Sequence, residues 1–191
     1  GRLDLVEWAR LALPRAFESI DAGVMADPPP AVFEELLRAI IAGTTTRESA
    51  TTGRVKIRYF SATSGESEKE ISPHTIVQAA GRHHVRAFDH TRNRGADFVI
   101  GRILEAAPAQ GEYYPAERDM EWQRWIDIRL SVSRGADATT ARAMMLSYGI
   151  PESGVRIIKT RAALHDYVVL AYGLRPRAYQ LPSITMDSEM L

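Results

Sequence analysis

The spacing of the apolar residues changes along the chain from helical to alternating and then to a mixture of the two. Over residues 3–17 and 32–41 apolar side chains recur at intervals of three or four, which predicts two helices separated by the prolines at 28–30. We expect the second helix to end at Gly43 in a left-handed cap. From Arg54 onward apolar and polar residues alternate, which is the period of a half-buried strand.

Short alternating segments separated by turn residues continue to about residue 104. They predict four strands, over residues 54–61, 69–79, 82–90 and 97–104. Their close spacing indicates a small antiparallel β-barrel, which leaves one face or mouth free for a ligand. Beyond residue 120 strand-like and helix-like segments alternate, at 126–132, 138–147, 155–159 and 162–172. They predict a β-α-β-α unit.

The order of these elements predicts an α+β protein in several parts. We expect a helical connector over residues 1–50, a small antiparallel barrel over 51–110, a small α/β extension over 120–178 and a frayed tail over 179–191. Because Gly1 stands where an initiator Met would, we expect the chain to be a piece of a longer protein with a functional domain upstream.

Composition narrows the possible chemistry. The 191 residues contain no cysteine, which excludes disulfides, cysteine-ligated zinc and thiol nucleophiles, and fits a cytoplasmic protein. No apolar run is long enough to cross a bilayer and the N-terminus has no signal-peptide pattern, so we expect no membrane partner.

Charge is concentrated in one block although the formal net charge of the chain is zero. Residues 54–102 hold nine Lys or Arg, five Asp or Glu and four of the five histidines. Arginine makes up 21 of the 24 basic residues, and its planar guanidinium grips phosphate or carboxylate at two points. The block therefore indicates an anionic ligand.

Strand alternation sorts this charge onto one face of the third predicted strand. It places Arg82, His84, Arg86 and Phe88 on one face and Val85 and other small apolar residues toward the core. If the next strand pairs antiparallel, Arg102 is expected to join Arg86. The alternative is that the arginines of the block form surface ion pairs with its five carboxylates, at Glu66, Glu68, Glu70, Asp89 and Asp97.

Enzymatic chemistry is not indicated. The histidines, among them the adjacent pair His83-His84, lack the spacing of a metal site because neighbours on a strand point to opposite faces. A triad of Ser61, His84 and Asp97 lacks a Gly-x-Ser-x-Gly elbow, and no glycine-rich nucleotide loop precedes a helix. We therefore expect no catalysis, no metal and no cofactor.

Four segments, taken in order, resemble a WYL domain, and most closely the transcriptional repressors associated with bacterial phage defence. They are Ile57-Arg58-Tyr59-Phe60-Ser61, Ile71-Ser72-Pro73-His74, the run from Gly81 to Phe88, and the run from Asp97 to Ile103. The name-giving Trp-Tyr-Leu tripeptide is His83-His84-Val85 here, and residues 125–173 are similar to the C-terminal extension of the family.

The resemblance implies a five-stranded Sm-like or SH3-like barrel that senses a nucleotide or short nucleic acid. It further implies a homodimeric regulator that binds DNA through an N-terminal winged helix-turn-helix, which is absent from these residues. The implied ligand site consists of Ser61, His74, Arg82, His84, Arg86, Phe98 and Arg102. Two alternatives stay open, a free-standing module for single-stranded oligonucleotides and a purely structural oligomerisation unit.

Overall fold

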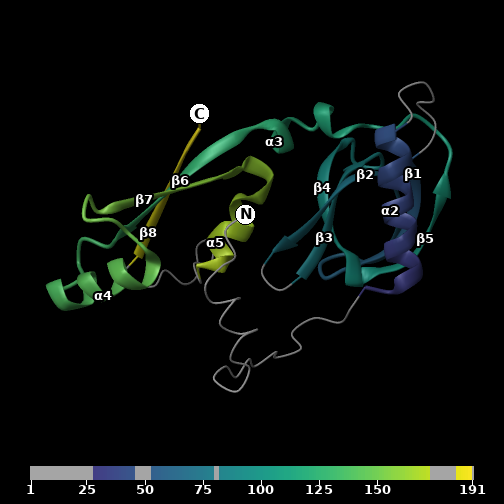
Figure 1. The fold of residues 1–191 in the computed structure, drawn as a ribbon. Coiled ribbons are helices and arrows are strands. Elements are labelled where there is room, and N and C mark those ends of the chain that lie inside the picture. The colour runs from purple at the N-terminus through teal and green to yellow at the C-terminus, as the bar shows by residue number, and fades with distance from the viewer. Residues whose placement is uncertain (1–27, 46–52, 80–81, 173–183, 191) are drawn as a thin grey trace, which may run out of the picture.

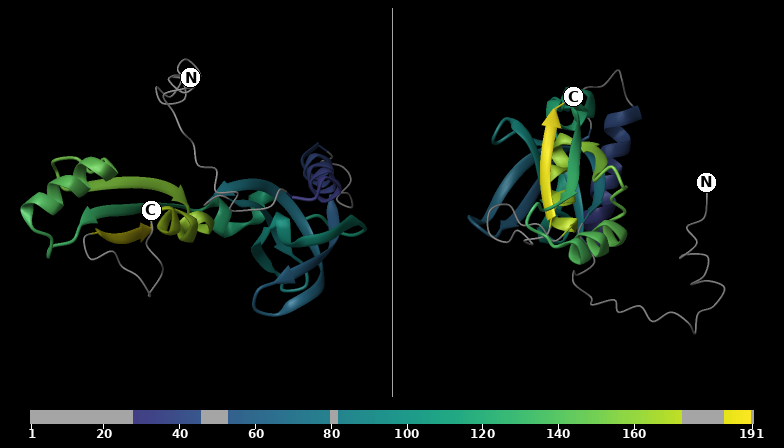
Figure 2. Two further views of the ribbon diagram at one scale, coloured as in Figure 1. Left: turned by 90° about the horizontal axis from the view of Figure 1, so that it is seen from below. Right: turned by 90° about the vertical axis from the view of Figure 1, so that its left-hand side faces the viewer.

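The computed structural model describes residues 28–45, 53–79, 82–172 and 184–190. Figure 1 shows helix α2 and a five-stranded sheet at one end, and a three-stranded sheet with two helices at the other. Seen from below, in Figure 2, the two units lie end to end in an elongated molecule. The helix expected over residues 3–17 lies outside the described residues.

Five antiparallel strands form the first sheet, in the order β4-β3-β2-β1-β5. Their bounds are Arg54–Ser61 for β1, Gly65–Ala79 for β2, Arg82–Asp89 for β3, Arg94–Val99 for β4 and Ile103–Ala109 for β5. Among the described residues the edge strands β4 and β5 are not paired with each other, so the sheet is antiparallel as expected but a closed barrel is not confirmed.

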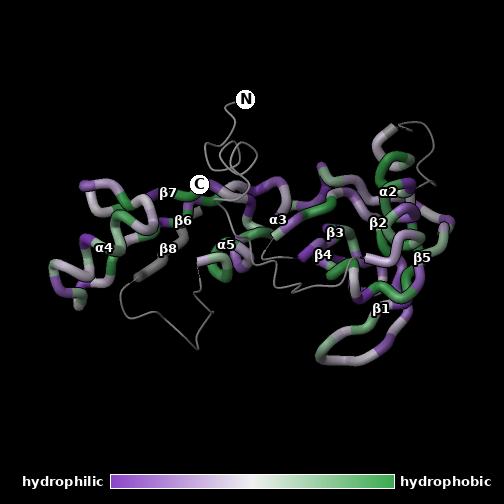
Figure 3. Tube along the Cα trace, turned by 60° about the horizontal axis from the view of Figure 1, so that its bottom comes forward, coloured by the Kyte–Doolittle hydropathy of each residue, from purple (hydrophilic) through white to green (hydrophobic). Residues whose placement is uncertain are grey.

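Helix α2, Pro30–Thr45, covers this sheet and contacts β2 and β5. Figure 3 colours much of α2 green, the hydrophobic end of the scale. Leu36 is fully buried, as are Val55 and Ile71 from the strands, because the helical and strand periods each place one apolar face toward the other. This is the main hydrophobic core.

The expected helix end at Gly43 is wrong, because α2 continues to Thr45. Gly43 has another reason to be a glycine. A Cβ there would lie 2.3 Å from the ring of Tyr113, whose hydroxyl donates to the backbone oxygen of Pro73 at 3.0 Å. The glycine thus lets the segment after β5 pack tightly against the helix.

The single strand expected over residues 97–104 is also wrong. It is divided into β4 and β5 by the 3-10 turn η2, Ile100–Arg102. Ile100 and Ile103 are both buried, and one 3-10 turn places residues three apart on the same side. The chain therefore changes direction without exposing either isoleucine.

A linker with the short helices η3, Ala116–Arg118, and α3, Met120–Gln123, leads to the second unit. Its strands β6, β7 and β8 pair antiparallel in the order β7-β6-β8, with helices α4 and α5 and the turn η4 beside them. The bounds are Trp125–Val132 for β6, Ala138–Tyr148 for α4, Val155–Arg161 for β7, Ala162–Leu164 for η4, His165–Ala171 for α5 and Ile184–Met190 for β8.

The expectation of a frayed tail fails for residues 184–190, because they form β8 and pair with β6. Ile184, Met186 and Met190 occupy alternate positions in this segment, which is the period of a strand and was overlooked in the expectation of a tail. The rest of the second unit agrees with the predicted order of strands and helices. None of the helices in the described ranges has the length and apolarity required to span a membrane.

Candidate functional site

The outward face of β3 carries the side chains that the alternation selected. Val85 and Ala87 are fully buried in the core, while His84, Arg86 and Phe88 point away from it. This face is nevertheless not open to solvent: Arg86 is only 2% exposed. The linker and α5 cover this face. The linker supplies side chains that contact Arg86, and α5 supplies one that contacts His84.

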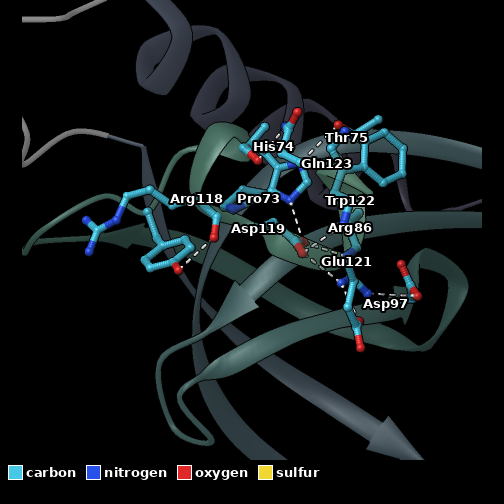
Figure 4. A network of polar contacts seen from close by, with 12 residues as sticks. Pro73, His74, Thr75, Arg86, Asp97, Arg118, Asp119, Glu121, Trp122 and Gln123 are labelled. Atoms are coloured by element: carbon cyan, nitrogen blue, oxygen red, sulfur yellow. Dashed lines mark hydrogen bonds and ion pairs between the residues drawn. The ribbon is translucent and has the colours of Figure 1, made fainter. Parts of the chain in front are cut away.

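Arg86 is held by carboxylates from two other segments (Figure 4). Its Nε donates to Oδ2 of Asp119 at 2.7 Å and its Nη2 to Oδ1 at 3.0 Å, which makes a two-point ion pair. Nη2 also donates to Oε2 of Glu121 at 2.9 Å, and Nη1 to Oδ2 of Asp97 at 3.3 Å. Three carboxylates therefore surround one guanidinium.

Asp119 is the centre of this network. Nε2 of His74 lies 3.3 Å from its Oδ2, and its Oδ1 accepts from the backbone nitrogen of Trp122 at 3.1 Å, so the carboxylate also caps α3. Burial alone would raise the pKa of Asp119, but hydrogen bonds from His74 and Arg86 hold it below its ordinary value. Asp119 is a stable anion in this position.

Asp97 behaves in the opposite way. Burial raises its pKa to about 6, because the attraction of Arg86 does not offset the lost solvation and the neighbouring charges of Asp119 and Glu121. Burial lowers the pKa of Arg86, but the hydrogen bonds and negative charges of Asp119, Asp97 and Glu121 together hold it above its ordinary value. The network contains more negative than positive groups.

A second cluster lies on the same face around His84. Burial lowers the pKa of His84, and the positive charges of Arg82 and Arg102 lower it further. Its ring is 3% exposed and lies 4.6 Å, between centroids, from the ring of Tyr167 on α5. Its Nδ1 is buried without a hydrogen-bond partner in the described part of the chain. We call Arg82, His84 and Arg102 the cationic cluster.

The cationic cluster has no carboxylate partner among the side chains that the structure describes. Within residues 28–45, 53–79 and 82–172 neither Arg82 nor Arg102 forms an ion pair. Arg102 was expected to lie beside Arg86, but the register of the strands does not place it there. Arg86 pairs with Asp97 across β3 and β4, whereas Arg102 lies in η2 beside His84.

The other part of the basic block agrees with the surface ion-pair alternative. Nζ of Lys56 lies 2.8 Å from Oε2 of Glu68, and Nη1 of Arg58 lies 2.9 Å from Oε1 of Glu66. Arg54 pairs in the same way with Glu70. These side chains form exposed or half-exposed ion pairs, which contribute little to stability.

Two expected ligand residues lie elsewhere. The Ser61 hydroxyl is 3.0 Å from that of Thr63 in the turn after β1. Phe98 is 4% exposed and packs edge-on against Tyr59, with 5.2 Å between ring centroids. These contacts account for both residues by turn formation and core packing, and a ligand role for them stays a prediction.

The sequence did not point to Asp119, Glu121 or Tyr167 as site residues. Asp119 was recognisable as a helix cap only once α3 was seen, since its helix has four residues. Tyr114, which stacks on Phe88 at 3.8 Å between centroids, also comes from the linker. No group of three or more possible metal ligands is found in the described part of the chain.

Comparison with known proteins agrees with the resemblance in the sequence. Residues 49–108 match the family profile described as the WYL domain. The "DNA-binding transcriptional repressor CapW" of Pseudomonas aeruginosa is 29% identical over 150 residues, which cover 78% of this chain and 50% of that protein. The repressor of the same name from Escherichia coli strain KTE188 is 26% identical over 173 residues, covering 90% of this chain and 52% of that protein.

The chain thus spans about half the length of these curated relatives. Among solved structures, the proteasome accessory factor B/C (PafBC) of Arthrobacter aurescens aligns with a TM-score of 0.36 and 14% identity, over 86% of this chain and 25% of its own. Residues 49–108 thus match the WYL domain, and the chain is similar over most of its length to DNA-binding transcriptional repressors named CapW.

Proposed function

We propose that this chain is the ligand-sensing and dimerisation part of a cytoplasmic transcriptional regulator. The ligand is a nucleotide or short nucleic acid whose phosphate binds the cationic cluster of Arg82, His84 and Arg102. DNA is bound by a winged helix-turn-helix that lies in the part of the relatives' length that this chain does not span. We also propose that the first sheet acts as a small Sm-like barrel. No reaction is catalysed.

One observation carries the ligand site. The exposed cations of β1 and the buried Arg86 all have carboxylate partners, whereas Arg82 and Arg102 have none among the described residues. Two guanidinium groups without a carboxylate partner in the described ranges, beside a buried imidazole whose Nδ1 has no hydrogen-bond partner there, favour a phosphate. A neutral ligand would leave that positive charge unpaired.

The position of α5 supports a sensing role. Tyr167 belongs to the second unit yet lies against His84 in the first. A ligand that enters the cationic cluster therefore contacts both units at once. For a switch, the ligand must bind two arrangements of these units with different affinity. A contact shared by both units is a suitable place for that difference to arise.

Titration with a fluorescein-labelled oligothymidylate of about eight nucleotides tests the site. We expect Arg82→Ala plus Arg102→Ala to weaken binding by at least about tenfold, which corresponds to roughly 1.4 kcal/mol. The matched control, Lys56→Ala plus Arg58→Ala, removes the same charge from ion-paired positions and should change binding little. Equal loss in both double variants would contradict the site, because it would indicate general electrostatic attraction.

A further inference from the structure

Helix α3 is attached to both units of the molecule. On one side the ring of its Trp122 lies 5.7 Å, between centroids, from the ring of His74 on β2. On the other side the guanidinium carbon of Arg161, on β7, lies 4.8 Å from the centroid of the same tryptophan ring. Arg161 also donates to the backbone oxygen of Trp122. Any movement of α3 therefore changes a contact with each sheet.

The start of α3 is held by Asp119 on Arg86. This carboxylate makes the contact that a ligand phosphate or carboxylate would make, because it binds the guanidinium at two points and lies within reach of the His74 ring. Arg86 and His84 are on the same face of β3, two residues apart. An anionic group next to the cationic cluster thus finds Arg86 already occupied from within the chain.

The pair itself is buried, but its linker side borders a cavity. This cavity of about 340 Å³ is lined by residues that include Gly95, Arg118, Asp119 and Glu121. The Glu121 side chain is 62% exposed although its carboxylate contacts Arg86. Of the three carboxylates, Asp119 and Glu121 belong to the linker, and only Asp97 belongs to the sheet itself. The linker carboxylates are the ones that can leave without unfolding the sheet.

We propose that Asp119, assisted by Glu121, is an internal competitor of the ligand. This inference rests on the proposed function and specifies how that site is regulated. A ligand with two or more anionic groups places one on the cationic cluster, and a second displaces Asp119 from Arg86 and His74. The displaced carboxylate releases the start of α3, and with it the contacts of Trp122 to both sheets. A ligand with one anionic group binds without releasing α3.

Neutral isosteres of the linker carboxylates test the competition. Asp119→Asn keeps an oxygen for the cap of α3 but removes the charge that holds Arg86. We expect it to tighten binding of the labelled oligothymidylate by about three- to tenfold, since the probe no longer competes with an anion. Glu112→Gln is the matched control, because it removes one negative charge from the exposed linker at a residue that pairs with Arg118. It should leave affinity within about twofold.

A second readout follows α3 directly. Hydrogen exchange of residues 119–124 should be slow in the free protein and should accelerate when the probe saturates it. Thymidine monophosphate should leave the exchange of this segment unchanged. Arg86→Ala placed in the Asp119→Asn background should abolish the gain in affinity, as a double-mutant cycle requires.

The outcomes separate this inference from the proposed function. If the probe binds and depends on Arg82 and Arg102, yet Asp119→Asn does not tighten binding and residues 119–124 stay protected in the complex, the internal competitor is wrong and the ligand site stands. If the probe does not depend on Arg82 and Arg102, the ligand site itself is wrong. Equally tighter binding in Asp119→Asn and in Glu112→Gln would also contradict the role of Asp119 as an internal competitor.

Discussion

Arg86 and Asp119 form a buried two-point ion pair although 33 residues separate them in sequence, with Nε to Oδ2 at 2.7 Å and Nη2 to Oδ1 at 3.0 Å. The side chains are 3% and 4% exposed. Burial of two charges is costly, and removal of one partner from such a pair leaves the other uncompensated. A guanidinium of the sheet therefore depends on a carboxylate of the linker.

Gly95 is expected to be necessary for the pair. A Cβ at this position would lie 2.5 Å from Nη2 of Arg86 and 3.0 Å from Oδ2 of Asp119, so Gly95→Ala should force the two apart. We expect a loss of about 1–3 kcal/mol in the free energy of unfolding, measured by urea denaturation. Gly135→Ala is the control, because a Cβ there meets nothing within 4 Å. An equal and small effect of both substitutions would show that Arg86 moves aside at no cost.

Asp97 is expected to make the protein less stable as pH rises from about 4 to above 6. Its pKa is raised to about 6 in the folded chain from an ordinary value of 3.8, so the folded state binds its proton more tightly than the unfolded state. The stabilising contribution is complete below the unfolded value and is lost as pH passes through the folded value, by at most roughly 1.4 kcal/mol per pH unit. Asp97→Asn should therefore be more stable than the wild type at pH 7.5 and gain little at pH 4. Parallel stability curves for the two proteins would contradict the shift.

His84 is expected to couple ligand binding to proton uptake. Burial and the charges of Arg82 and Arg102 lower its pKa in the free chain, and a bound phosphate would oppose both of those charges. Affinity for the labelled oligothymidylate should rise as pH falls from about 7 toward 5, because the protonated imidazole gains a partner. His84→Asn should flatten this profile, measured as Kd against pH. His83 serves as the neighbouring control, and His83→Asn should retain the slope of the wild type.

The salt dependence should distinguish a local ligand site from a groove for single strands. Contact of one or two phosphates with Arg82 and Arg102 predicts a slope of log affinity against log salt of about −0.7 to −1.4. A free-standing single-strand module that follows the backbone over many nucleotides would give a slope several times steeper. Titration at four or more salt concentrations measures the difference, and a steep slope would favour the module over the sensor.

Part of this molecule was predictable because its signals are local. Alternation over Arg54–Ser61 and Arg82–Asp89 predicted strands, and the inward positions Val85 and Ala87 are fully buried as the two-residue period requires. Gly149 ends α4 with a left-handed φ of 60°, the conformation in which glycine commonly ends a helix. Two of the motifs that resemble a WYL domain, residues 57–61 and 71–74, each lie within a single strand, and the profile match covers them.

Other predictions failed, mostly where the contact that decides the structure is distant in sequence. Gly43 was expected to end a helix but accommodates Tyr113, which lies 70 positions later in the chain. Ile100 and Ile103 were expected on one strand and lie instead around a 3-10 turn. Strand β8 pairs with β6, although the alternation of Ile184, Met186 and Met190 was also a local signal for it. Short-range patterns cannot report such partners.

The sequence alone determined which side chains share the outer face of β3, because strand geometry alternates without regard to the rest of the fold. Only the tertiary structure decided which of them stay available to an anion. Asp119 reaches Arg86 through a linker whose path is not encoded in any local period, and it neutralises that arginine. Arg82 and Arg102 have no such partner in the described part of the chain. The strength of a charge depends on its neighbours in space, and those neighbours are fixed only when the chain folds.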